Sequence, residues 1–411
     1  MDLTTDAKKA YRLLRRAFTA RTAHQRVTAL LAQQPPHPAA HYRIAVYFAD
    51  TAVNVYQMRQ WYRPLQQLAE RWPVVVISRS PVGAAALLED GALPVAFTPQ
   101  IEDLERFIAE QDIRIVLYVN QNTRNFQMLR YGRRWHVFIS HGESDKIYMA
   151  SNQYKAYDYA LIAGQAAADR LREALWDYDV DARTLRIGRP QADHFSGTPP
   201  YTADDRTVVL YAPTWEGDRP SMSYGSVVSH GVTLVGRLVA TGRHRVIYRP
   251  HPRTGVMEHR YAAASRRIVA MLKAANQADP SAQHVFDEGP EVGWQLAAAD
   301  VAVLDVSAMV YDRLATGKPL MVTRPVSAEA EIDRNGYLSA CEWLTAEGAH
   351  DIVSEIDRVR VDEEAVTRLR TWSERYFGDT SPGAATARFH AAIERLMQLW
   401  DAQYARETSP T

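Results

Sequence analysis

Residues 301–323 join a short apolar run to a polar turn and a helix-like pattern, an arrangement suited to binding an anion. The run 301–304 is β-branched and bounded by Asp305, which favours a buried parallel strand. Ser307 stands where a helix would be capped, so the backbone N–H groups of the next three residues would lack helical partners. These residues are Ala308, Met309 and Val310. A phosphate could occupy this helix N-terminus; the alternative is an ordinary strand–helix unit in which Ser307 only caps.

Two histidines also follow apolar runs. His141 follows residues 136–140, and its imidazole could take a proton from an attacking hydroxyl group. The next residue, Gly142, would let the chain turn sharply there. His251 lies in Arg-Pro-His-Pro-Arg, where two prolines stiffen the turn and Arg249 and Arg253 could neutralise phosphate charge. A structural histidine at 141 and a solvated basic turn at 249–253 are the alternatives.

Alternating strand and helix patterns should position these residues. A first series of apolar runs covers 42–48, 74–77, 95–97, 113–119 and 136–140, with helical patterns at 56–71 and 101–110. A second series covers 207–211, 245–248, 285–286, 301–304 and 320–323. This alternation predicts two doubly wound α/β domains, whose ligands bind beyond the carboxyl ends of the strands. Neither half carries a dinucleotide or P-loop motif.

Composition is compatible with an intracellular protein of two domains. The chain has 411 residues, with Lys+Arg and Asp+Glu both at 48, so no global field attracts nucleic acid. The single Cys341 excludes an internal disulfide, which fits a reducing compartment. No run approaches the roughly 18 apolar residues needed to span a bilayer, and no signal-peptide core is visible. We therefore expect a cytoplasmic protein.

The N-terminal region has a different composition. Basic and apolar residues are interleaved between Lys8 and Arg26, and Pro35, Pro36 and Pro38 then mark a linker. A helix over residues 8–30 could lie on an anionic membrane surface. The alternative is a solvated helix packed against its own domain.

Six polar clusters follow one another in a family-like order. They are ISHGESDK (139–146), RIGRPQAD (186–193), LYAPTWEG (210–217), IYRPHPRTG (247–255), VLDVSAMVYDRLATGKPL (from 303) and YFGDTSPGAATARF (376–389). Their order resembles the CDP-glycerol glycerophosphotransferase family of teichoic-acid and capsule polymerases, over roughly residues 140–389. The resemblance implies a GT-B fold, two facing Rossmann-like domains. It also implies transfer of a polyol phosphate from a CDP-activated donor to an acceptor hydroxyl, with release of CMP.

The resemblance assigns the acceptor side to the first domain. His141, with Gly142, matches the pair proposed to supply the catalytic base, and Lys146 also matches. Glu143, Ser144 and Asp145 stand where threonine, proline and leucine are more usual. The extra carboxylates of Glu143 and Asp145 could orient His141 or bond a different polyol.

The donor side falls in the second domain. The resemblance places His251 at the donor phosphates, and Arg249, Arg253 and Ser307 are its expected companions. The hydroxyl of Thr214 could also donate to phosphate, although a structural turn with Trp215 as packing anchor is the alternative. Ala308 replaces a common second serine, so its backbone N–H and that of Met309 would bind the diphosphate. Asp305 should position the turn, and Asp312 could reach ribose or glycerol hydroxyls.

The expected organisation has four parts. These are a basic helical extension and linker (1–40), an acceptor domain (41–190), a CDP-donor domain (191–380), and a C-terminal helix that could cross back to the first domain (381–411). The expected activity is transfer of glycerol phosphate, or a related polyol phosphate, to a lipid-linked or polymeric acceptor. The enzyme would act in the cytoplasm or on the inner face of the cell membrane, without a metal or other cofactor. Asp177, Asp179 and Asp181 resemble a metal motif, but their position at a helix end favours a solvated loop.

Two other functions remain open from the sequence. A GT-B glycosyltransferase that uses a nucleotide sugar would share the diphosphate site but attack carbon. A catalytically silent nucleotide-binding or scaffold protein would keep its cellular role without His141.

Overall fold

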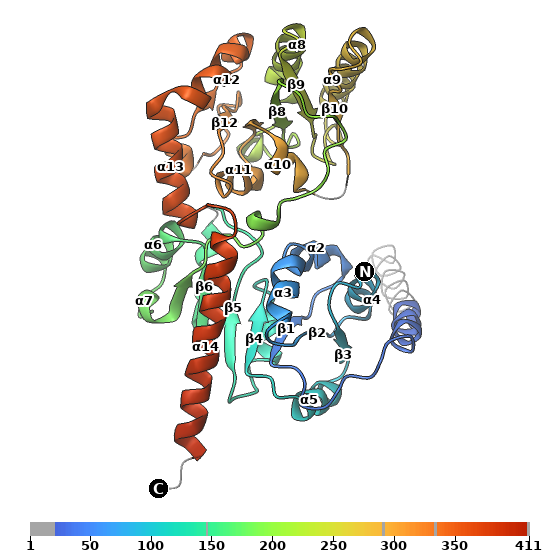
Figure 1. The fold of residues 1–411 in the computed structure, drawn as a ribbon, viewed down its shortest axis with the longest axis vertical. Helices are drawn as coiled ribbons and strands as arrows, with labels where there is room; N and C mark the ends of the chain where they lie inside the picture. Colours follow the sequence, from blue (N-terminus) through green and yellow to red (C-terminus); the bar gives the residue numbers. More distant parts are fainter. Residues whose placement is uncertain (1–20, 145–146, 290–291, 333–334, 409–411) are drawn as a thin grey trace, which may run out of the picture.

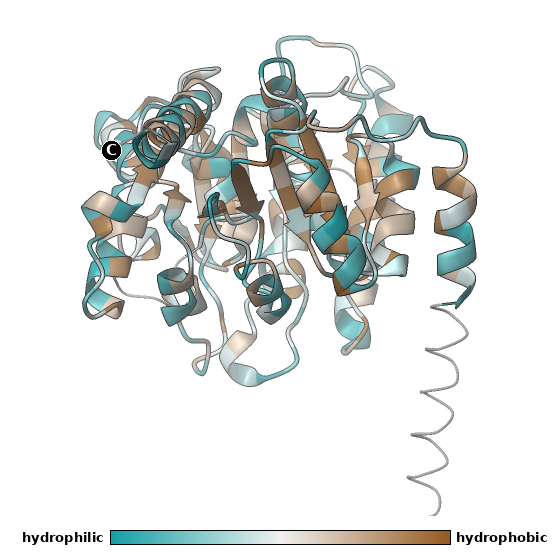
Figure 2. Ribbon diagram, turned by 90° about the horizontal axis from the view of Figure 1, so that it is seen from below, coloured by the Kyte–Doolittle hydropathy of each residue, from teal (hydrophilic) through white to brown (hydrophobic). Residues whose placement is uncertain are grey.

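The computed structural model describes residues 21–144, 147–289, 292–332 and 335–408 and shows two lobes, each built on one parallel sheet (Figure 1). Asp145 and Lys146, both expected on the acceptor side, lie outside the described residues. Figure 2 shows that the strands are mainly apolar while the surrounding helices turn hydrophilic residues outward. This pattern is typical of parallel sheets covered on both faces.

The first lobe holds seven strands in the order β3-β2-β1-β4-β5-β6-β7. Their bounds are β1 (Ile44–Phe48), β2 (Val74–Ser78), β3 (Val95–Phe97), β4 (Ile115–Tyr118), β5 (Trp135–Phe138), β6 (Tyr159–Ile162) and β7 (Thr184–Arg186). At the centre of the sheet Val46 pairs with Val76 on one side and Leu117 on the other. The strand β1 is buried along its whole length, as its continuous apolar sequence requires.

Along the described chain, α-helices lie between the strands of this sheet. They are α2 (Val55–Arg59), α3 (Tyr62–Ala69), α4 (Pro81–Asp90), α5 (Ile101–Glu110), α6 (Gln165–Ala174) and α7 (Val180–Arg183). The single helix expected over 56–71 is wrong, because the chain breaks between α2 and α3. Pro64 would clash with the carbonyl group of Gln60 in a continuous helix and has no N–H to donate. The start of α4 follows the usual rules, since the Ser80 hydroxyl accepts from the Gly83 N–H at 3.2 Å and Pro81 comes next.

The second lobe holds six strands in the order β10-β9-β8-β11-β12-β13. Their bounds are β8 (Thr207–Ala212), β9 (His244–Tyr248), β10 (Val285–Phe286), β11 (Val301–Leu304), β12 (Leu320–Thr323) and β13 (Trp343–Leu344). The accompanying helices are α8 (Val232–Ala240), α9 (His259–Ala278), α10 (Trp294–Ala298), α11 (Ala308–Leu314), α12 (Ile352–Val361) and α13 (Glu363–Phe377).

The long helix α14 (Ala384–Thr408) returns from the second lobe and runs along the first (Figure 1). Phe389, Ile393 and Leu396 are fully buried in the core of the first lobe. The ring centroid of Phe389 lies 5.2 Å from that of Trp61 in the first lobe. The helix α14 therefore completes the core of the first lobe, although it is the last helix of the sequence.

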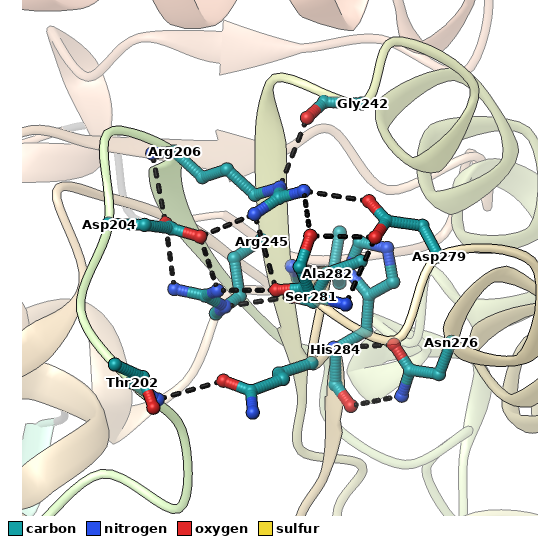
Figure 3. Close-up of polar contacts among 12 residues, drawn as sticks. Thr202, Asp204, Arg206, Gly242, Arg245, Asn276, Asp279, Ser281, Ala282 and His284 are labelled. Carbon is teal, nitrogen blue, oxygen red and sulfur yellow. Dashed lines mark hydrogen bonds and ion pairs between the residues drawn. The ribbon is translucent and has the colours of Figure 1, made fainter.

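A network of charges closes the end of the second sheet that lies away from the carboxyl ends (Figure 3). Arg245 is 1% exposed and bonds both carboxylate oxygens of Asp204, at 3.0 and 2.8 Å. It also donates to the carbonyl oxygens of Ser281 and Ala282. Because this buried cation is fully engaged in bracing loops, we interpret the network as structural.

The helix at 21–31 packs against the first lobe through Val27, which is fully buried, with Leu30 and Leu31 partly buried beside it. The basic residues from Lys8 to Arg16 lie outside the described residues. Among the helices in the described ranges, none combines the length and the apolar character needed to cross a membrane.

The aspartates at 177–181 behave as a loop and a helix cap. Asp179 accepts from the Ala182 N–H at 3.0 Å and caps α7, and Asp181 pairs with Arg172 at 2.6 Å. Within the described parts of the chain, no group of three or more His, Cys, Asp or Glu side chains could hold a metal ion.

Candidate active site

The polar clusters gather at the carboxyl ends of neighbouring strands. In the first lobe β1, β4 and β5 are adjacent, and they lead to Asp50, Asn120 and His141. In the second lobe β9, β8 and β11 are adjacent, and they lead to the turns that hold His251, Thr214 and Ser307. Because neighbouring strands lie about 5 Å apart, each lobe presents its polar turns as one group.

His141 is held in one orientation. Its Nδ1 lies 3.1 Å from the carbonyl oxygen of Val119, an atom that can only accept a hydrogen bond. Nδ1 must therefore carry the proton, which leaves Nε2 as an acceptor in the neutral ring. Burial lowers the pKa of His141, the bond to Val119 opposes this, and the nearby Arg189 cation lowers it further. A neutral imidazole with a free Nε2 is what a general base requires.

The turn at His141 is strained at Ser140 rather than at Gly142. Ser140 has φ of 55°, a left-handed conformation that non-glycine residues rarely adopt. The indole N–H of Trp61 donates to the Ser140 carbonyl oxygen at 2.5 Å, and the Ser140 hydroxyl donates to the Gly142 carbonyl oxygen at 3.0 Å. The expectation that Gly142 supplies the sharp turn is therefore wrong. A Cβ there would meet Arg189 at an ordinary 3.5 Å.

Glu143 is buried and forms an ion pair with Arg170 on α6. Its Oε1 also accepts from the Ser144 N–H at 3.0 Å. These contacts hold Glu143 beneath the turn. The carboxylate that replaces the more usual threonine is therefore neutralised by Arg170.

Arg189, which the sequence alone did not single out, joins the two lobes. It is 7% exposed, lies beside Gly142, and pairs with Asp312 on α11 at 2.5 Å. Its Nε is buried without a hydrogen-bond partner in the described structure. Asp312 and Ala308 are four residues apart, so they share one face of α11. The cation thus lies between the turn of His141 and the helix that begins after Ser307, and Asp312 is engaged by protein.

We expect Arg189→Lys to destabilise the fold by about 1–2 kcal/mol, because lysine lacks the planar fork that reaches Asp312 from a buried position. Arg375→Lys is the matched control, since Arg375 pairs with Asp169 at 2.8 Å but both side chains are well exposed. That exposed pair should contribute less than about 1 kcal/mol. Urea unfolding of both variants measures the difference, and equal losses would contradict the prediction.

Asp305 is fully buried and organises three turns of the second lobe. Its Oδ2 accepts from the backbone N–H groups of Thr214 at 2.8 Å and Ser226 at 3.0 Å, and its Oδ1 accepts from the Thr323 hydroxyl at 2.6 Å. Burial raises the pKa of Asp305 to about 6, although these hydrogen bonds act the other way. Both oxygens are engaged, so Asp305 positions the site instead of touching a ligand.

Ser307 precedes α11 as expected, but its side chain does not cap the helix. Its Oγ is buried and has no hydrogen-bond partner in the described structure. The Val310 N–H is bonded to the Ser307 carbonyl oxygen at 3.2 Å, so the expectation of three free N–H groups is wrong. The N–H groups of Ala308 and Met309 form no such bond in the described residues. A hydroxyl and two amides are left to bind an anion.

His251 has the opposite tautomer to His141. The backbone N–H of Arg253 donates to His251 Nδ1 at 3.1 Å, so the neutral ring carries its proton on Nε2. Burial lowers the pKa of His251, Arg253 lowers it further, and Glu216 acts the other way. The ring is stacked near Trp215, with centroids 6.3 Å apart, and the Arg253 guanidinium lies 3.6 Å from the Trp215 centroid. This half-buried imidazole can donate from Nε2 to a phosphate oxygen.

Arg249 is engaged by protein. It forms an ion pair with Asp287 and donates to the Gly289 carbonyl oxygen at 2.8 Å. Its guanidinium braces the loop after β10, whereas Arg253 is exposed and forms no ion pair among the described residues. Of the two arginines, Arg253 is the better placed to neutralise a bound diphosphate.

Glu216 holds the loop that carries His251. It is 2% exposed, and its carboxylate accepts from the backbone N–H groups of Gly255 at 2.9 Å, Met257 at 2.7 Å and Glu258 at 3.0 Å. Burial would raise the pKa of Glu216, but these N–H groups outweigh it and lower the pKa. The sequence patterns did not single out Glu216, although its place directly after Trp215 is a feature that could have indicated it.

We expect Glu216→Gln to destabilise the fold by about 1–3 kcal/mol at pH 7, because an amide NH₂ would face backbone N–H groups. The folded pKa of Glu216 is depressed, so its contribution is present above the unfolded pKa and is lost as pH falls through the folded value. The difference in free energy of unfolding between wild type and variant, measured with urea, should therefore decrease as the pH falls. Glu258→Gln, which changes a partly exposed side chain on the same loop, is the control. A difference in free energy of unfolding that widens under acid would contradict the prediction.

The arrangement matches a known family. The family model described as CDP-Glycerol:Poly(glycerophosphate) glycerophosphotransferase matches residues 137–395. The chain belongs to this family. The matched segment starts within β5, before His141, and ends within α14, so it includes the turns of His141, Thr214, His251 and Ser307. Members are enzymes that transfer glycerol phosphate from CDP-glycerol. No curated protein matches the chain.

Solved structures share the fold at low sequence identity. The wall teichoic acid polymerase TagF is 12% identical with a TM-score of 0.55, covering 97% of this chain and 99% of that one. A UDP-N-acetylglucosamine 2-epimerase is 12% identical with a TM-score of 0.57, covering 90% and 98%. A putative epimerase of the same kind from Listeria monocytogenes is 13% identical with a TM-score of 0.56, covering 87% and 97%. These likenesses confirm the GT-B architecture.

His141 and His251 make no direct contact with each other in the described structure, and the two sides meet through Arg189 and Asp312. Thr214, Asp305 and Ser307 come together at the ends of β8 and β11. The N–H of His251 donates to the Pro213 carbonyl oxygen at 3.2 Å, which brings the His251 turn into the same group.

Proposed function

We propose that this enzyme transfers glycerol phosphate from CDP-glycerol to an acceptor hydroxyl in the synthesis of a teichoic-acid-like polymer, and that His141 and His251 have opposite roles in the transfer. The observation that supports this is the pair of tautomers. His141 offers a bare Nε2 toward a hydroxyl proton, while His251 offers an N–H toward phosphate oxygen. Base and electrophile are thus separated onto the two lobes.

The proposed step is an in-line displacement at the β-phosphorus of CDP-glycerol. The acceptor O–H gives its proton to Nε2 of His141 while the acceptor oxygen bonds to phosphorus. The bond from phosphorus to the bridging oxygen breaks, and that oxygen leaves as part of CMP. His251, Arg253, the Ser307 hydroxyl and the amides of Ala308 and Met309 stabilise the charge that moves onto the phosphates. The products are a phosphodiester, CMP and one proton.

A donor comparison tests this function. The purified protein is incubated with CDP-glycerol, CDP-ribitol or UDP-glucose, together with a hydroxylated acceptor, and the released nucleotide is identified by chromatography. CMP from a CDP-polyol supports phosphoryl transfer. A nucleoside diphosphate released from UDP-glucose would instead support the nucleotide-sugar glycosyltransferase and overturn the proposal.

The same proposal includes a lipid-linked acceptor and a membrane contact through residues 8–30. In the described part of this region Val27 faces the protein core, and Arg21, His24 and Gln25 are exposed. Flotation with anionic liposomes, with and without residues 1–34, tests the contact. Equal flotation of both chains would remove it.

A further inference from the structure

A polar cluster lies beside His141 at the carboxyl end of the first sheet. Asp50 follows β1, and its Oδ2 accepts from Asn54 Nδ2 at 2.8 Å and Asn122 Nδ2 at 3.0 Å. Asn120 follows β4 and donates from Nδ2 to Gln57 Oε1 at 2.7 Å. Asn120 comes directly after Val119, the residue that orients His141. The cluster therefore lies at the ends of β1 and β4, beside the end of β5 that carries His141.

An exposed aromatic ring completes this surface. Tyr56 is 48% exposed, and its ring stands perpendicular to that of His141 with centroids 5.9 Å apart. Its hydroxyl oxygen accepts from Gln57 Nε2 at 3.3 Å, which joins the ring to the amide cluster. A large flat apolar surface next to a base, open to solvent, is available to a substrate ring.

The charges of this surface suit hydroxyl groups better than phosphates. Asp50 forms no ion pair among the described residues, and its hydrogen-bond partners are neutral amides. Arg124 lies next to Asp50, because its guanidinium donates to the carbonyl oxygen of the preceding residue, Ala49, at 3.4 Å. Asp50 balances the charge of Arg124, and Asp312 balances that of Arg189 beside His141, so the described residues offer no surplus of positive charge for a phosphodiester chain. Carboxylate and amide groups together can accept from and donate to several hydroxyls.

We propose that the acceptor is a neutral sugar unit, which stacks on Tyr56 and bonds its other hydroxyls to Asp50, Asn120 and Asn122. This inference rests on the proposed function and specifies its acceptor. The sugar hydroxyl that faces His141 loses its proton to Nε2 and forms the new bond to phosphorus, while CMP leaves. The enzyme then places glycerol phosphate on a glycoside, in preference to the end of a poly(glycerol phosphate) chain.

The test compares acceptors that carry the same octyl tail. One set has octyl glycosides of neutral hexoses, N-acetylhexosamines and their disaccharides, and the other has an octyl-linked glycerol phosphate oligomer. With CDP-glycerol as donor, we expect at least one glycoside to exceed the oligomer tenfold or more in kcat/KM. A preference for the oligomer would overturn the inference in favour of chain extension.

Variants of Tyr56 test whether its ring binds the sugar. Tyr56→Ala should raise the KM for the glycoside roughly 3- to 10-fold, whereas Tyr56→Phe keeps the ring and should restore it. Tyr404→Ala is the matched control, because Tyr404 is also 48% exposed but lies on α14. An unchanged KM in Tyr56→Ala would overturn the stacking.

Donor binding distinguishes a failure of the acceptor inference from a failure of the proposed function. CDP-glycerol should raise the unfolding temperature of wild type and Tyr56→Ala equally. If it does so and no glycoside is used, the acceptor inference alone fails. If CDP-glycerol neither binds nor yields CMP, the proposed function fails and this inference with it.

Discussion

Replacing His141 with asparagine is expected to lower turnover by about 10²- to 10⁴-fold while leaving the fold intact, because the acceptor hydroxyl loses its base. Asparagine is smaller and can still donate to the Val119 carbonyl oxygen, so the turn should keep its shape. CMP release under saturating donor and acceptor measures the effect. His350→Asn is the matched control, since His350 is exposed and lies outside the site.

The pH profile provides an independent check on the same residue. The proposed base, His141, acts in its neutral form, and its pKa is lowered from 6.5 mainly by burial. Activity should therefore persist at pH 6.5 and fall only in more acidic solution, as Nε2 becomes protonated. The residual activity of His141→Asn should lack this acidic limb. A variant that kept most of its turnover, or the same limb, would exclude His141 as the base.

The second large effect concerns Asp305→Ala, which should destabilise the protein by about 3–6 kcal/mol. The change leaves two buried N–H groups and the Thr323 hydroxyl without their acceptor, at about 1–3 kcal/mol for each orphaned group. Asp305→Asn is the matched control, because its oxygen can accept from both N–H groups while its NH₂ donates to Thr323. At pH 4, where Asp305 of the folded wild type is protonated, urea unfolding should show similar free energies of unfolding for wild type and Asp305→Asn, and a much lower one for Asp305→Ala.

The same pair of variants tests the charge of Asp305. Its pKa is about 6 in the fold against 3.8 for the ordinary group, so the folded state holds the proton more tightly. Between these values the folded protein binds more protons than the unfolded chain, and its stability decreases as pH rises. The neutral Asp305→Asn should lack this decrease, gaining on wild type by up to roughly 3 kcal/mol between pH 4 and pH 6. A wild type that gained on the variant over this range would contradict the raised pKa.

The fold could be predicted where periodicity was strong and the run was bounded by turn residues. The helix at 101–110 and the strands at 95–97, 301–304 and 320–323 agree with the structure residue for residue. The strands β6, β7 and β13 were missed. In β7 only Thr184 is buried and in β13 only Leu344, so neither strand shows an apolar run. The helix predicted over 56–71 is divided into α2 and α3, because Pro64 cannot continue a helix that began at Val55.

The site could be predicted only as far as local position reveals it. His141, His251 and Ser307 were found because each follows an apolar strand. Arg189 and Glu216 act through residues that the fold brings to them, namely Asp312 and the backbone at 255–258, and no spacing in the sequence announces such partners. Arg249 was expected on the phosphates for its charge, but the loop after β10 supplies Asp287 as its partner.

The return of α14 to the first lobe has a consequence for biosynthesis. Phe389, Ile393 and Leu396 fill the first core, yet the ribosome makes them after the whole second lobe. Until they emerge, the nascent first lobe leaves the apolar side of Trp61 uncovered, a state that favours aggregation or chaperone capture. The two halves are therefore not separable modules, and a fragment that ends before α14 should be insoluble on its own.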